Sequence, residues 1–574
     1  MMGKGKAIVA GVSLILVVGV VVGVVAGISR SGKSTNDASG NIDNNLSTGM
    51  KAVKTICEPT DYKDVCMRTL GTVANNGTAN PKDFIKVAVS STMDVVKTAM
   101  EKATTLSKNI DNSTQKNALA DCNELLQYAV DDLQESISMV GDNELKTVNE
   151  RVADLTNWLS AVVAYQQTCL DGISHPELKS AMENGGIINA TELTSNALAI
   201  VTEIANILSA FNIPIDINPK SRRLLEEETT ALDGEGFPTW FSAADRKLLA
   251  ARGGAQMRPN AVVAKDGSGQ YKTITAALNA YPKNNKGRYV IYVKAGIYDE
   301  YITVTKDQAN VFMYGDGPRK SIVTGNKSNK GGFGTFKTAS FSAIGKGFIA
   351  RGMGFRNTAG PEGHQAVALR VQSDFAAFYN CRMDGYQDTL YVQTYRQFYR
   401  NCVVSGTVDF IFGDSTTVMQ NCLIIARKPM DNQQNTVTAH GRAIKRETTG
   451  LVIQNSRIVP EQKLFPVRFK IPTFLGRPWK EYARTVIMES TLGDFIQPAG
   501  WMPWDTTGFA QSTCYYAEYA NRGPGARTNR RVRWKGVHVI TDRREAAQFT
   551  AGPFLSGHLW LRATGAPFLL GFKR

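Results

Sequence analysis

A repeat with a period near 20 residues limits the folds open to this chain more than any other feature of its sequence. Short stretches such as FYNC and YRNC place an asparagine after an aromatic or aliphatic residue and before a small one, at Asn357, Asn380, Asn401, Asn421 and Asn455. Their spacings are 23, 21, 20 and 34 residues, so one turn carries a longer insertion. Short β-branched and aromatic runs at this period predict a parallel β-helix. Leucine-rich repeats would need a leucine ladder, and β-propeller blades a period about twice as long.

Two acidic residues follow this period. Asp388 in QDTL and Asp409 in DFIFG are 21 residues apart, among residues suited to buried strands, where an unpaired carboxylate is costly. Equivalent positions on successive coils of a β-helix lie about 4.8 Å apart, so the two acids should be neighbours. Gln365 and Gln387 are 22 apart and should lie on nearly the same line. The sequence therefore predicts that two carboxylates and two amides converge on one face.

Such a pair suits hydrolytic chemistry. Adjacent carboxylates do not both ionise easily, so one can donate a proton while the other attacks as an anion. A cation beside Asp409 would stabilise that anion, and the amides could hold an oxyanion. Acyl transfer at an ester and glycoside hydrolysis both fit, because retaining glycosidases use a similar carboxylate separation. The structural alternative is that the acids satisfy backbone donors in turns. Neither a GxSxG motif nor a Ser-His-Asp arrangement is evident.

Three cysteines also follow the repeat. Cys381, Cys402 and Cys422 occupy the same position of successive coils, close enough for Cys402 to bridge to Cys422 or to Cys381. We take Cys402–Cys422 as the expected pair. Cys514 has no evident partner. The chain contains no CxxC pair, so a zinc site is not expected.

The front of the chain has a different pattern. Residues 50–212 repeat apolar side chains at helical spacing and predict a helical bundle. Cys57 and Cys66 suit a small disulfide-closed hairpin, and Cys122 and Cys169 could join two antiparallel helices. A linker over 213–258 contains the pairs RR and RK before leucines, in polar surroundings that invite proteolysis; the predicted processing residues are Arg222, Arg223, Arg246 and Lys247. A solvated charge run is the alternative for each pair.

The N-terminal segment and the distribution of charge predict the cellular route of the chain and the class of ligand that it binds. Residues 7–28 are uncharged and long enough to cross a bilayer, so we interpret 1–34 as a signal anchor. Five N-x-Ser/Thr sequons agree with the secretory route. Residues 41–215 carry 13 Lys and Arg against 22 Asp and Glu, whereas residues 216–574 carry 49 against 28. The basic part would attract a polyanion, either nucleic acid or an acidic polysaccharide.

Five sequence blocks, in order, resemble the plant pectin methylesterases: GIYDE (296–300), QAVAL (365–369), QDTL (387–390), DFIFG (409–413) and LGRPW (475–479). The resemblance implies that residues 259–574 form a right-handed parallel β-helix. It also implies hydrolysis of the methyl esters of homogalacturonan, releasing methanol. The rival readings are a different β-helix pectin-degrading enzyme and a non-catalytic wall-binding or inhibitor protein.

The same resemblance implies roles for individual residues. Asp409 would be the nucleophile, and Asp388 the acid that protonates departing methanol and then the base that activates water. Arg477 in LGRPW would hold Asp409 charged and oriented. Gln365 and Gln387 would stabilise the oxyanion. Two further residues would contact the substrate: Thr335 in GGFGTFKT, and Trp479, which would pack against a sugar ring. The mechanism would need neither a metal nor a cofactor.

The front of the chain resembles the pectin methylesterase inhibitor domain through ALADCNELLQYAVDDL and TCLDG. This implies a precursor: a four-helix bundle with two disulfides, the processing sites, then the enzyme. We expect pectin as substrate, with inhibitor proteins and a processing protease as further partners, and no nucleic acid. The chain is expected to act as a secreted, cell-wall monomer that meets a membrane only through its N-terminal segment. The acidic bundle could cover the basic enzyme until it is removed.

Overall fold

The computed structural model describes residues 48–74, 80–210 and 258–573. The predicted signal anchor and all four processing residues lie outside these ranges. The chain divides into two compact units, residues 1–111 with 122–222 and residues 112–121 with 223–574, and each is described by itself.

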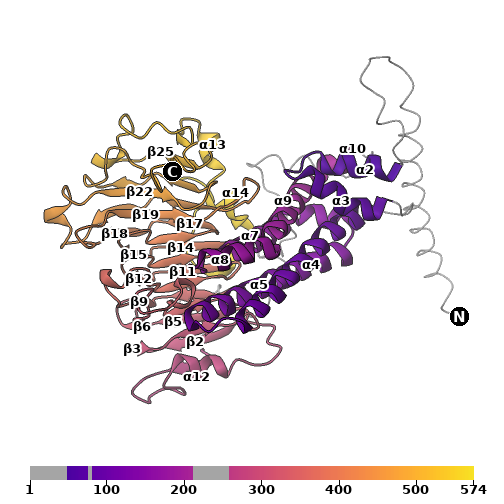
Figure 1. Ribbon diagram of the computed structural model, residues 1–574. Coiled ribbons are helices and arrows are strands. Elements are labelled where there is room, and N and C mark those ends of the chain that lie inside the picture. Colours follow the sequence, from indigo (N-terminus) through magenta and orange to yellow (C-terminus); the bar gives the residue numbers. More distant parts are fainter. Residues whose placement is uncertain (1–47, 75–79, 211–257, 574) are drawn as a thin grey trace, which may run out of the picture. The chain divides into compact units, whose positions relative to one another are not determined.

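The first unit is helical, as the apolar spacing predicts (Figure 1). Its long helices are α4 (Pro81–Lys108), α5 (Ser113–Asp142, of which residues 122–142 belong to this unit), α7 (Val152–Asp171) and α9 (Ile188–Thr202). The shorter elements are α2 (Thr48–Cys57), α3 (Lys63–Ala74), α6 (Leu145–Glu150), α8 (Pro176–Met182), the π-helical turn Glu183–Ile187, and α10 (Ile204–Ala210). Local sequence sets where α4 begins: Asn80 and Asp83 form a capping box around Pro81.

The long helices are joined by specific contacts as well as by apolar packing. The Cys122–Cys169 disulfide connects α5 to α7, as predicted. The buried Gln166 of α7 donates from Nε2 to Thr194 Oγ1 of α9 at 3.2 Å, and its Oε1 accepts from Thr191 Oγ1 at 2.9 Å. Both ends of this buried amide are therefore satisfied, which avoids the cost of burying an unpaired polar group.

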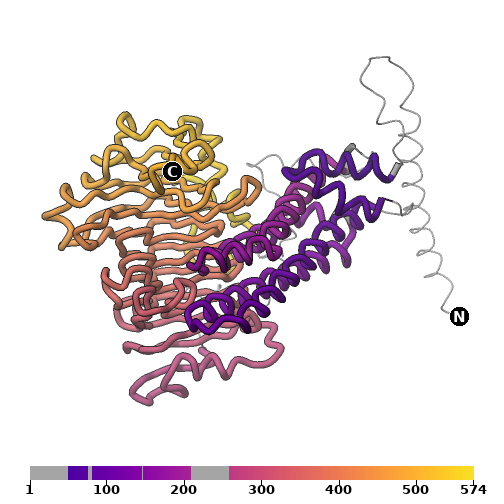
Figure 2. Tube along the Cα trace, viewed as in Figure 1, coloured from indigo at the N-terminus to yellow at the C-terminus, as the bar shows by residue number. Residues whose placement is uncertain are grey.

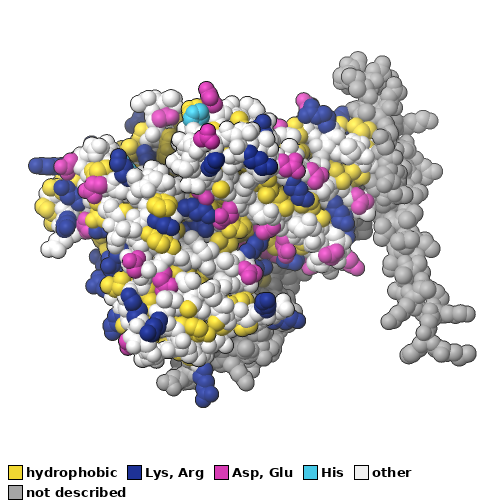
Figure 3. Space-filling model, turned by 60° about the horizontal axis from the view of Figure 1, so that its bottom comes forward, with side chains coloured by type: hydrophobic (Ala, Val, Ile, Leu, Met, Phe, Trp, Pro, Cys, Tyr) yellow, Lys and Arg dark blue, Asp and Glu magenta, His cyan; other side chains and the backbone are white. Residues whose placement is uncertain are grey.

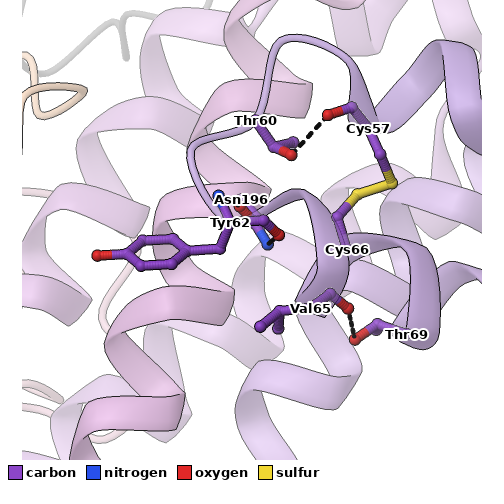
Figure 4. Close-up of a disulfide and its surroundings, with 7 residues drawn as sticks. All are labelled: Cys57, Thr60, Tyr62, Val65, Cys66, Thr69 and Asn196. Atoms are coloured by element: carbon purple, nitrogen blue, oxygen red, sulfur yellow. Dashed lines mark hydrogen bonds between the residues drawn. A yellow bond between two sulfur atoms is a disulfide. The ribbon is translucent and has the colours of Figure 1, made fainter.

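The predicted Cys57–Cys66 disulfide closes the hairpin between α2 and α3 (Figure 4). Asn196 of α9 holds this hairpin from the side. Its Nδ2 donates to the carbonyl oxygen of Tyr62 at 2.9 Å, and its Oδ1 accepts the Tyr62 N–H at 3.1 Å. The Asn196 amide thus bonds both main-chain polar groups of Tyr62, as a neighbouring strand would, and attaches the hairpin to the bundle.

The second unit is the predicted parallel β-helix, in which strands of three parallel sheets alternate along the chain (Figure 2). The eleven-stranded sheet contains β1 (Ala261–Val263), β2 (Tyr289–Val293), β5 (Val311–Gly315), β8 (Ile349–Arg351), β11 (Ala376–Tyr379), β14 (Arg396–Arg400), β17 (Thr416–Gln420), β20 (Gly450–Gln454), β23 (Arg484–Met488), β25 (Tyr515–Tyr519) and β26 (Val537–Val539).

The other two sheets complete each coil. The eight-stranded sheet contains β3 (Gly296–Asp299), β6 (Ser321–Gly325), β9 (Gly354–Asn357), β12 (Arg382–Asp384), β15 (Val403–Gly406), β18 (Leu423–Ala426), β21 (Arg457–Pro460) and β24 (Thr491–Leu492). The seven-stranded sheet contains β4 (Ile302–Val304), β7 (Phe341–Ala343), β10 (Leu369–Val371), β13 (Leu390–Val392), β16 (Ile411–Gly413), β19 (Asn435–His440) and β22 (Thr473–Pro478). Short helices flank the coils: α12 (Ile274–Asn279), α13 (Arg543–Ala547) and α14 (Ala551–Leu555).

The interior of the β-helix is apolar and stacked. Phe378 and Tyr399, which are in register on β11 and β14, lie with ring centroids 4.9 Å apart, and both are fully buried. Equivalent side chains of successive coils therefore pack on one another, which is why the sequence shows a periodic apolar pattern.

Four of the five repeat asparagines occupy one bend, at which the chain leaves the eleven-stranded sheet. Asn380, Asn401, Asn421 and Asn455 have φ between 48° and 57°, the left-handed conformation that asparagine tolerates. Assigning FRNT to the same repeat position was wrong. Asn357 is the last residue of β9, and Gly352, with φ of 63°, occupies the bend of that coil. Glycine adopts this conformation more easily than asparagine, so the bend is kept without the motif.

The expected Cys402–Cys422 bridge is absent: Cys381, Cys402, Cys422 and Cys514 are all buried free thiols. The Cys402 thiol donates to the Phe378 and Arg400 carbonyl oxygens, and that of Cys422 to the Tyr399 and Gln420 carbonyl oxygens. On the next coils, Ser456 and Ser490 donate to main-chain carbonyls in the same way. The position selects a small hydrogen-bond donor, and stacking of the cysteines does not by itself imply a bond.

Candidate active site

The strand register brings Asp388 and Asp409 into adjacent coils. Leu390 pairs with Ile411, so each acid occupies the same position, two residues before its strand. Both acids have a left-handed backbone, with φ of 61° and 50°. That conformation costs a non-glycine residue about 1–2 kcal/mol. Both are largely buried, with 7% and 6% of their surface exposed. The convergence predicted from the 21-residue spacing is therefore present, on strained backbone of the kind that gathers at functional sites.

Asp409 is held by two side chains from later coils. Arg477 on β22 donates from Nε to Oδ1 at 2.9 Å and from Nη2 to Oδ2 at 2.6 Å. Thr436 on β19 donates its hydroxyl to Oδ1 at 2.6 Å and accepts the Asp409 N–H at 2.8 Å. The bidentate ion pair and the hydroxyl fix the plane of the carboxylate and stabilise its anion. Arg477 is therefore the cation expected beside Asp409.

Asp388 has the opposite electrostatic environment. Burial raises its pKa well above the usual aspartate range, the charge of Asp409 raises it further, and the Arg477 guanidinium offsets part of this. Asp388 is therefore protonated at pH values where an ordinary aspartate is ionised. One acid of the pair is suited to give a proton and the other to act as an anion.

A row of side chains in register crosses the outer face of the seven-stranded sheet beside these acids. Tyr391, Phe412, Ala439 and Arg477 are successive members of the row. The rings of Tyr391 and Phe412 stack at 4.3 Å, and Trp479 lies 6.0 Å from Phe412. The predicted contact residue Trp479 thus packs against a buried cluster of Tyr391, Phe412 and Ala439 that adjoins Arg477.

The two glutamines lie beside the acids, displaced by one residue from a common line. The register places Ala366, not Gln365, opposite Gln387, and the Ala366 N–H donates to the Gln387 carbonyl oxygen at 3.2 Å. Gln387 is 9% exposed and Gln365 is half-buried. In the described part of the chain, neither side-chain amide makes a hydrogen bond within the protein. Both amides are therefore available to an incoming group.

Thr335 begins a 3-10 turn, Thr335–Lys337, in the connection that leads into β7. This connection is hydrogen-bonded to the segment that carries Gln365. The Asn329 N–H donates to the Gln365 carbonyl oxygen at 2.8 Å, and the Lys330 N–H donates to the Gly363 carbonyl oxygen at 3.1 Å. Thr335 is half-buried. It therefore belongs to the same edge of the coils as the acids, on an earlier coil.

Sequence reasoning missed Thr436 and Trp504. Thr436 lies 27 residues after Asp409 because the intervening turn is longer than the repeat, so no simple period points to it. Trp504 packs under Arg477, whose guanidinium carbon lies 4.4 Å from the centroid of the indole. The strand register, in which Ile411 pairs with Thr438, places Thr436 opposite Asp409 as the next member of the Asp388–Asp409 column. The sequence carries no signal for Trp504.

A second group of buried titratable side chains lies just beyond β16. Asp414, His440 and Glu447 are all at most 5% exposed. Burial raises the pKa of Glu447 well above its usual range, and the neighbouring Asp414 carboxyl raises it further. Burial lowers the pKa of His440 well below its usual value, and Arg442 and Arg484 add to this. Glu447 Oε2 accepts the N–H groups of Ala443 and Ile444, so the protonated acid supports the loop between β19 and β20.

Comparison with known proteins identifies this arrangement. The family model described as "Pectinesterase" matches residues 260–558, and the model described as "Plant invertase/pectin methylesterase inhibitor" matches residues 51–200. The chain belongs to the pectinesterase family. It is therefore a carboxylic ester hydrolase built as a pectinesterase precursor with an inhibitor-like pro-region.

Individual pectinesterases agree with this assignment. Pectinesterase 4 of Arabidopsis thaliana is 43% identical over 99% of this chain and 100% of its own length. Pectinesterase 3 of Citrus sinensis is 42% identical, covering 93% of this chain and 91% of its own. Among solved structures, the pectin methylesterase from carrot superposes with a TM-score of 0.55 and 52% identity, over 56% of this chain and all of its own. The β-helix is right-handed, as in that family.

No helix among residues 48–74, 80–210 and 258–573 combines the length and the apolar character needed to span a bilayer. The same residues contain no group of three or more His, Cys, Asp or Glu side chains placed to hold a metal ion.

Proposed function

We propose that this chain hydrolyses the methyl esters of pectin in the plant cell wall, with Asp409 as nucleophile and Asp388 as acid and base. The observation that carries the proposal is the asymmetric acid pair. Asp409 is fixed as an anion by the bidentate Arg477 contact at 2.9 and 2.6 Å, and the raised pKa of Asp388 keeps its proton available. Membership of the pectinesterase family supports the substrate class.

In the first half-reaction, a carboxylate oxygen of Asp409 attacks the carbonyl carbon of the methyl ester. The carbonyl oxygen becomes an oxyanion, to which the side-chain amides of Gln365 and Gln387 donate. The intermediate collapses with cleavage of the carbon–methoxy bond, and Asp388 gives its proton to the leaving oxygen. Methanol departs, and the substrate acyl group is left on Asp409.

In the second half-reaction, Asp388 is ionised and takes a proton from water. The resulting hydroxide attacks the acyl carbon, the bond to Asp409 breaks, and a free galacturonate carboxylate is released. Arg477 keeps the departing Asp409 carboxylate oriented for the next cycle. Trp479 and Thr335 contact the sugar chain on either side of the reacting ester.

The remaining expectations belong to the same proposal. The inhibitor-like unit keeps the enzyme inactive in the precursor until a protease removes it after Arg222–Arg223 or Arg246–Lys247. The N-terminal segment directs the chain to the secretory route, and the released enzyme acts in the wall as a monomer. The excess of Lys and Arg in residues 216–574 favours binding to partly demethylated pectin. On the face drawn in Figure 3, basic side chains are interspersed with acidic ones.

The test is to treat methylated pectin with the chain cut after Lys247 and to assay three products in parallel. We expect methanol without new reducing ends and without unsaturated ends. Reducing or unsaturated ends without methanol would contradict the esterase and favour a different pectin-degrading enzyme. Binding without any product would favour a non-catalytic wall protein. The uncut chain, run beside the cut chain, should release methanol more slowly if the pro-region inhibits.

A further inference from the structure

The connection between β21 and β22, residues 461–472, carries the two most exposed aromatic side chains among the described residues. Phe465 is 53% exposed and Phe469 is 66% exposed. We name Phe465, Arg468 and Phe469 the aromatic–arginine stack. Exposed aromatic rings are costly in water, and a patch of them in a monomer marks an interaction site more often than isolated surface residues do.

The stack has a fixed geometry. The guanidinium carbon of Arg468 lies 4.0 Å from the ring centroid of Phe465 and 4.1 Å from that of Phe469. Asp494 holds the same guanidinium, with Nε to Oδ1 at 3.0 Å and Nη2 to Oδ2 at 2.9 Å. Arg468 Nη1 also donates to the Phe465 carbonyl oxygen at 2.9 Å. Both rings are therefore presented to solvent in a defined position, which lowers the entropy lost when a ligand binds.

The loop beneath the stack is anchored in the β-helix. Leu464 is fully buried and Ile471 is 8% exposed, and both belong to the apolar core. Backbone hydrogen bonds close the turn, including Val467 N–H to the Leu464 carbonyl oxygen at 3.0 Å and Lys470 N–H to the Val467 carbonyl oxygen at 2.8 Å. The exposed rings are thus not required to fill the core, and removing them should leave the loop in place.

The position of the loop relates it to the active site. Residues 461–472 lead directly into β22, which carries Arg477, and they leave the eight-stranded sheet at the same edge at which Asp388 and Asp409 precede their strands. Two coil spacings separate β22 from β16, which is about 10 Å along the axis of the β-helix. A linear chain that extends from the acid pair along the axis of the β-helix, past Arg477, would reach this loop.

We propose that the aromatic–arginine stack binds a distal, demethylated stretch of the same galacturonan chain that is being hydrolysed. The inference rests on the proposed function. Sugar rings present C–H faces that pack on aromatic rings, and the exposed Lys463 and Lys470 flank the stack with charges complementary to galacturonate. The acidic Glu461 is occupied by Arg427, whose Nε lies 3.3 Å from Oε2. The enzyme would then be retained near the carboxylates that it has already produced.

The test compares the variant Phe465→Ala/Phe469→Ala with Ile297→Ala, which removes an equally exposed apolar side chain from the distant strand β3. On long, partly demethylated pectin, the double variant should raise KM about tenfold, equivalent to about 1.4 kcal/mol, with kcat unchanged. On short methylated galacturonate oligomers that fill only the active site, both variants should match the wild type. Unchanged KM on the polymer, or an equal rise on short oligomers, would overturn the proposal.

A binding measurement separates this inference from the proposed function. Fully demethylated polygalacturonate carries no ester, so its affinity for the chain cut after Lys247 can be measured whether or not that chain releases methanol. The double variant should bind about tenfold more weakly than wild type, and Ile297→Ala should not. The difference should shrink in high salt if Lys463 and Lys470 contribute. Equal binding of the double variant and wild type, with altered affinity for the inhibitor-like unit instead, would assign the stack to a protein partner and refute the proposal.

Discussion

The hydroxyl of Thr436 should be needed to position Asp409, although no sequence motif points to it. In Thr436→Val, the side chain keeps its shape but loses the oxygen that donates to Oδ1 at 2.6 Å and accepts the Asp409 N–H at 2.8 Å. A hydrogen bond to a charged group contributes about 1.5–3 kcal/mol, and a buried N–H without a partner costs about 1–3 kcal/mol. Asp409 also has φ of 50°, and the lost N–H contact is one of the interactions that maintain that strained backbone.

These contributions affect stability and catalysis differently. The unpaired N–H destabilises the folded enzyme unit by about 1–3 kcal/mol. The freed carboxylate can rotate away from the attack geometry, and a rise of about 1.4–2.7 kcal/mol in the barrier corresponds to a 10–100-fold fall in kcat. KM should change little, because Thr436 is fully buried and its hydroxyl donates to Asp409.

The assay is initial-rate methanol release from methylated pectin, with folding checked by circular dichroism and thermal unfolding. Thr436→Ser keeps the hydroxyl and should retain most of the activity. Thr438→Val removes a buried hydroxyl from the same strand that donates to the Leu475 carbonyl oxygen, not to an acid, so it should lower stability without a comparable fall in kcat. If folded Thr436→Val had wild-type kcat and KM, a positioning role for Thr436 would be refuted.

Three further predictions concern other groups. Arg477→Lys replaces a two-point contact to Asp409 with one, so methanol release should fall about 100-fold or more; near-normal rates would refute the orienting role. Because the pKa of Glu447 is raised, the folded chain keeps a proton that an unfolded glutamate releases above about pH 4.3. The free energy of unfolding therefore falls by about 1.4 kcal/mol per pH unit, from that pH up to the folded-state pKa. Glu447→Gln should flatten that decline in pH-dependent unfolding, and an unchanged slope would count against a buried neutral acid. Unfolded without reductant, the chain should expose four reactive thiols, and Cys402→Ser should fold normally; two or fewer thiols would indicate a bridge.

The repeat in the sequence was sufficient to predict the β-helix and its acid pair. A coil is a fixed circuit, so a 21-residue separation translates directly into adjacency of Asp388 and Asp409. The same periodicity misassigned Asn357, because the bend in that coil uses a glycine and leaves the local sequence without its marker. A sequence period thus predicts which residues lie on adjacent coils when the turns are short. It fails when the residue types in a turn change, as they do before Asn357.

The details that the sequence did not yield depend on side-chain contacts across long turns. Thr436 and Trp504 reach the site from coils whose connections are irregular, so their spacing carries no simple signal. The cysteines were misinterpreted because adjacency was taken as bonding, whereas Cys402 and Cys422 donate to main-chain carbonyls as Ser456 does one coil later. The asymmetry of the acid pair required the structure as well, since burial and the Arg477 contact decide which acid keeps its proton.

Methanol release by Asp409→Asn and Asp388→Asn, measured beside their binding to methylated pectin, tests the central claim most directly. The two acids form one catalytic unit if each substitution abolishes release, by about 1,000-fold or more, while pectin binding and thermal stability remain close to wild type. Substantial release by folded Asp409→Asn would contradict the assignment of the nucleophile. Release by Asp388→Asn that kept the wild-type rate and pH profile would contradict the shared role of the pair.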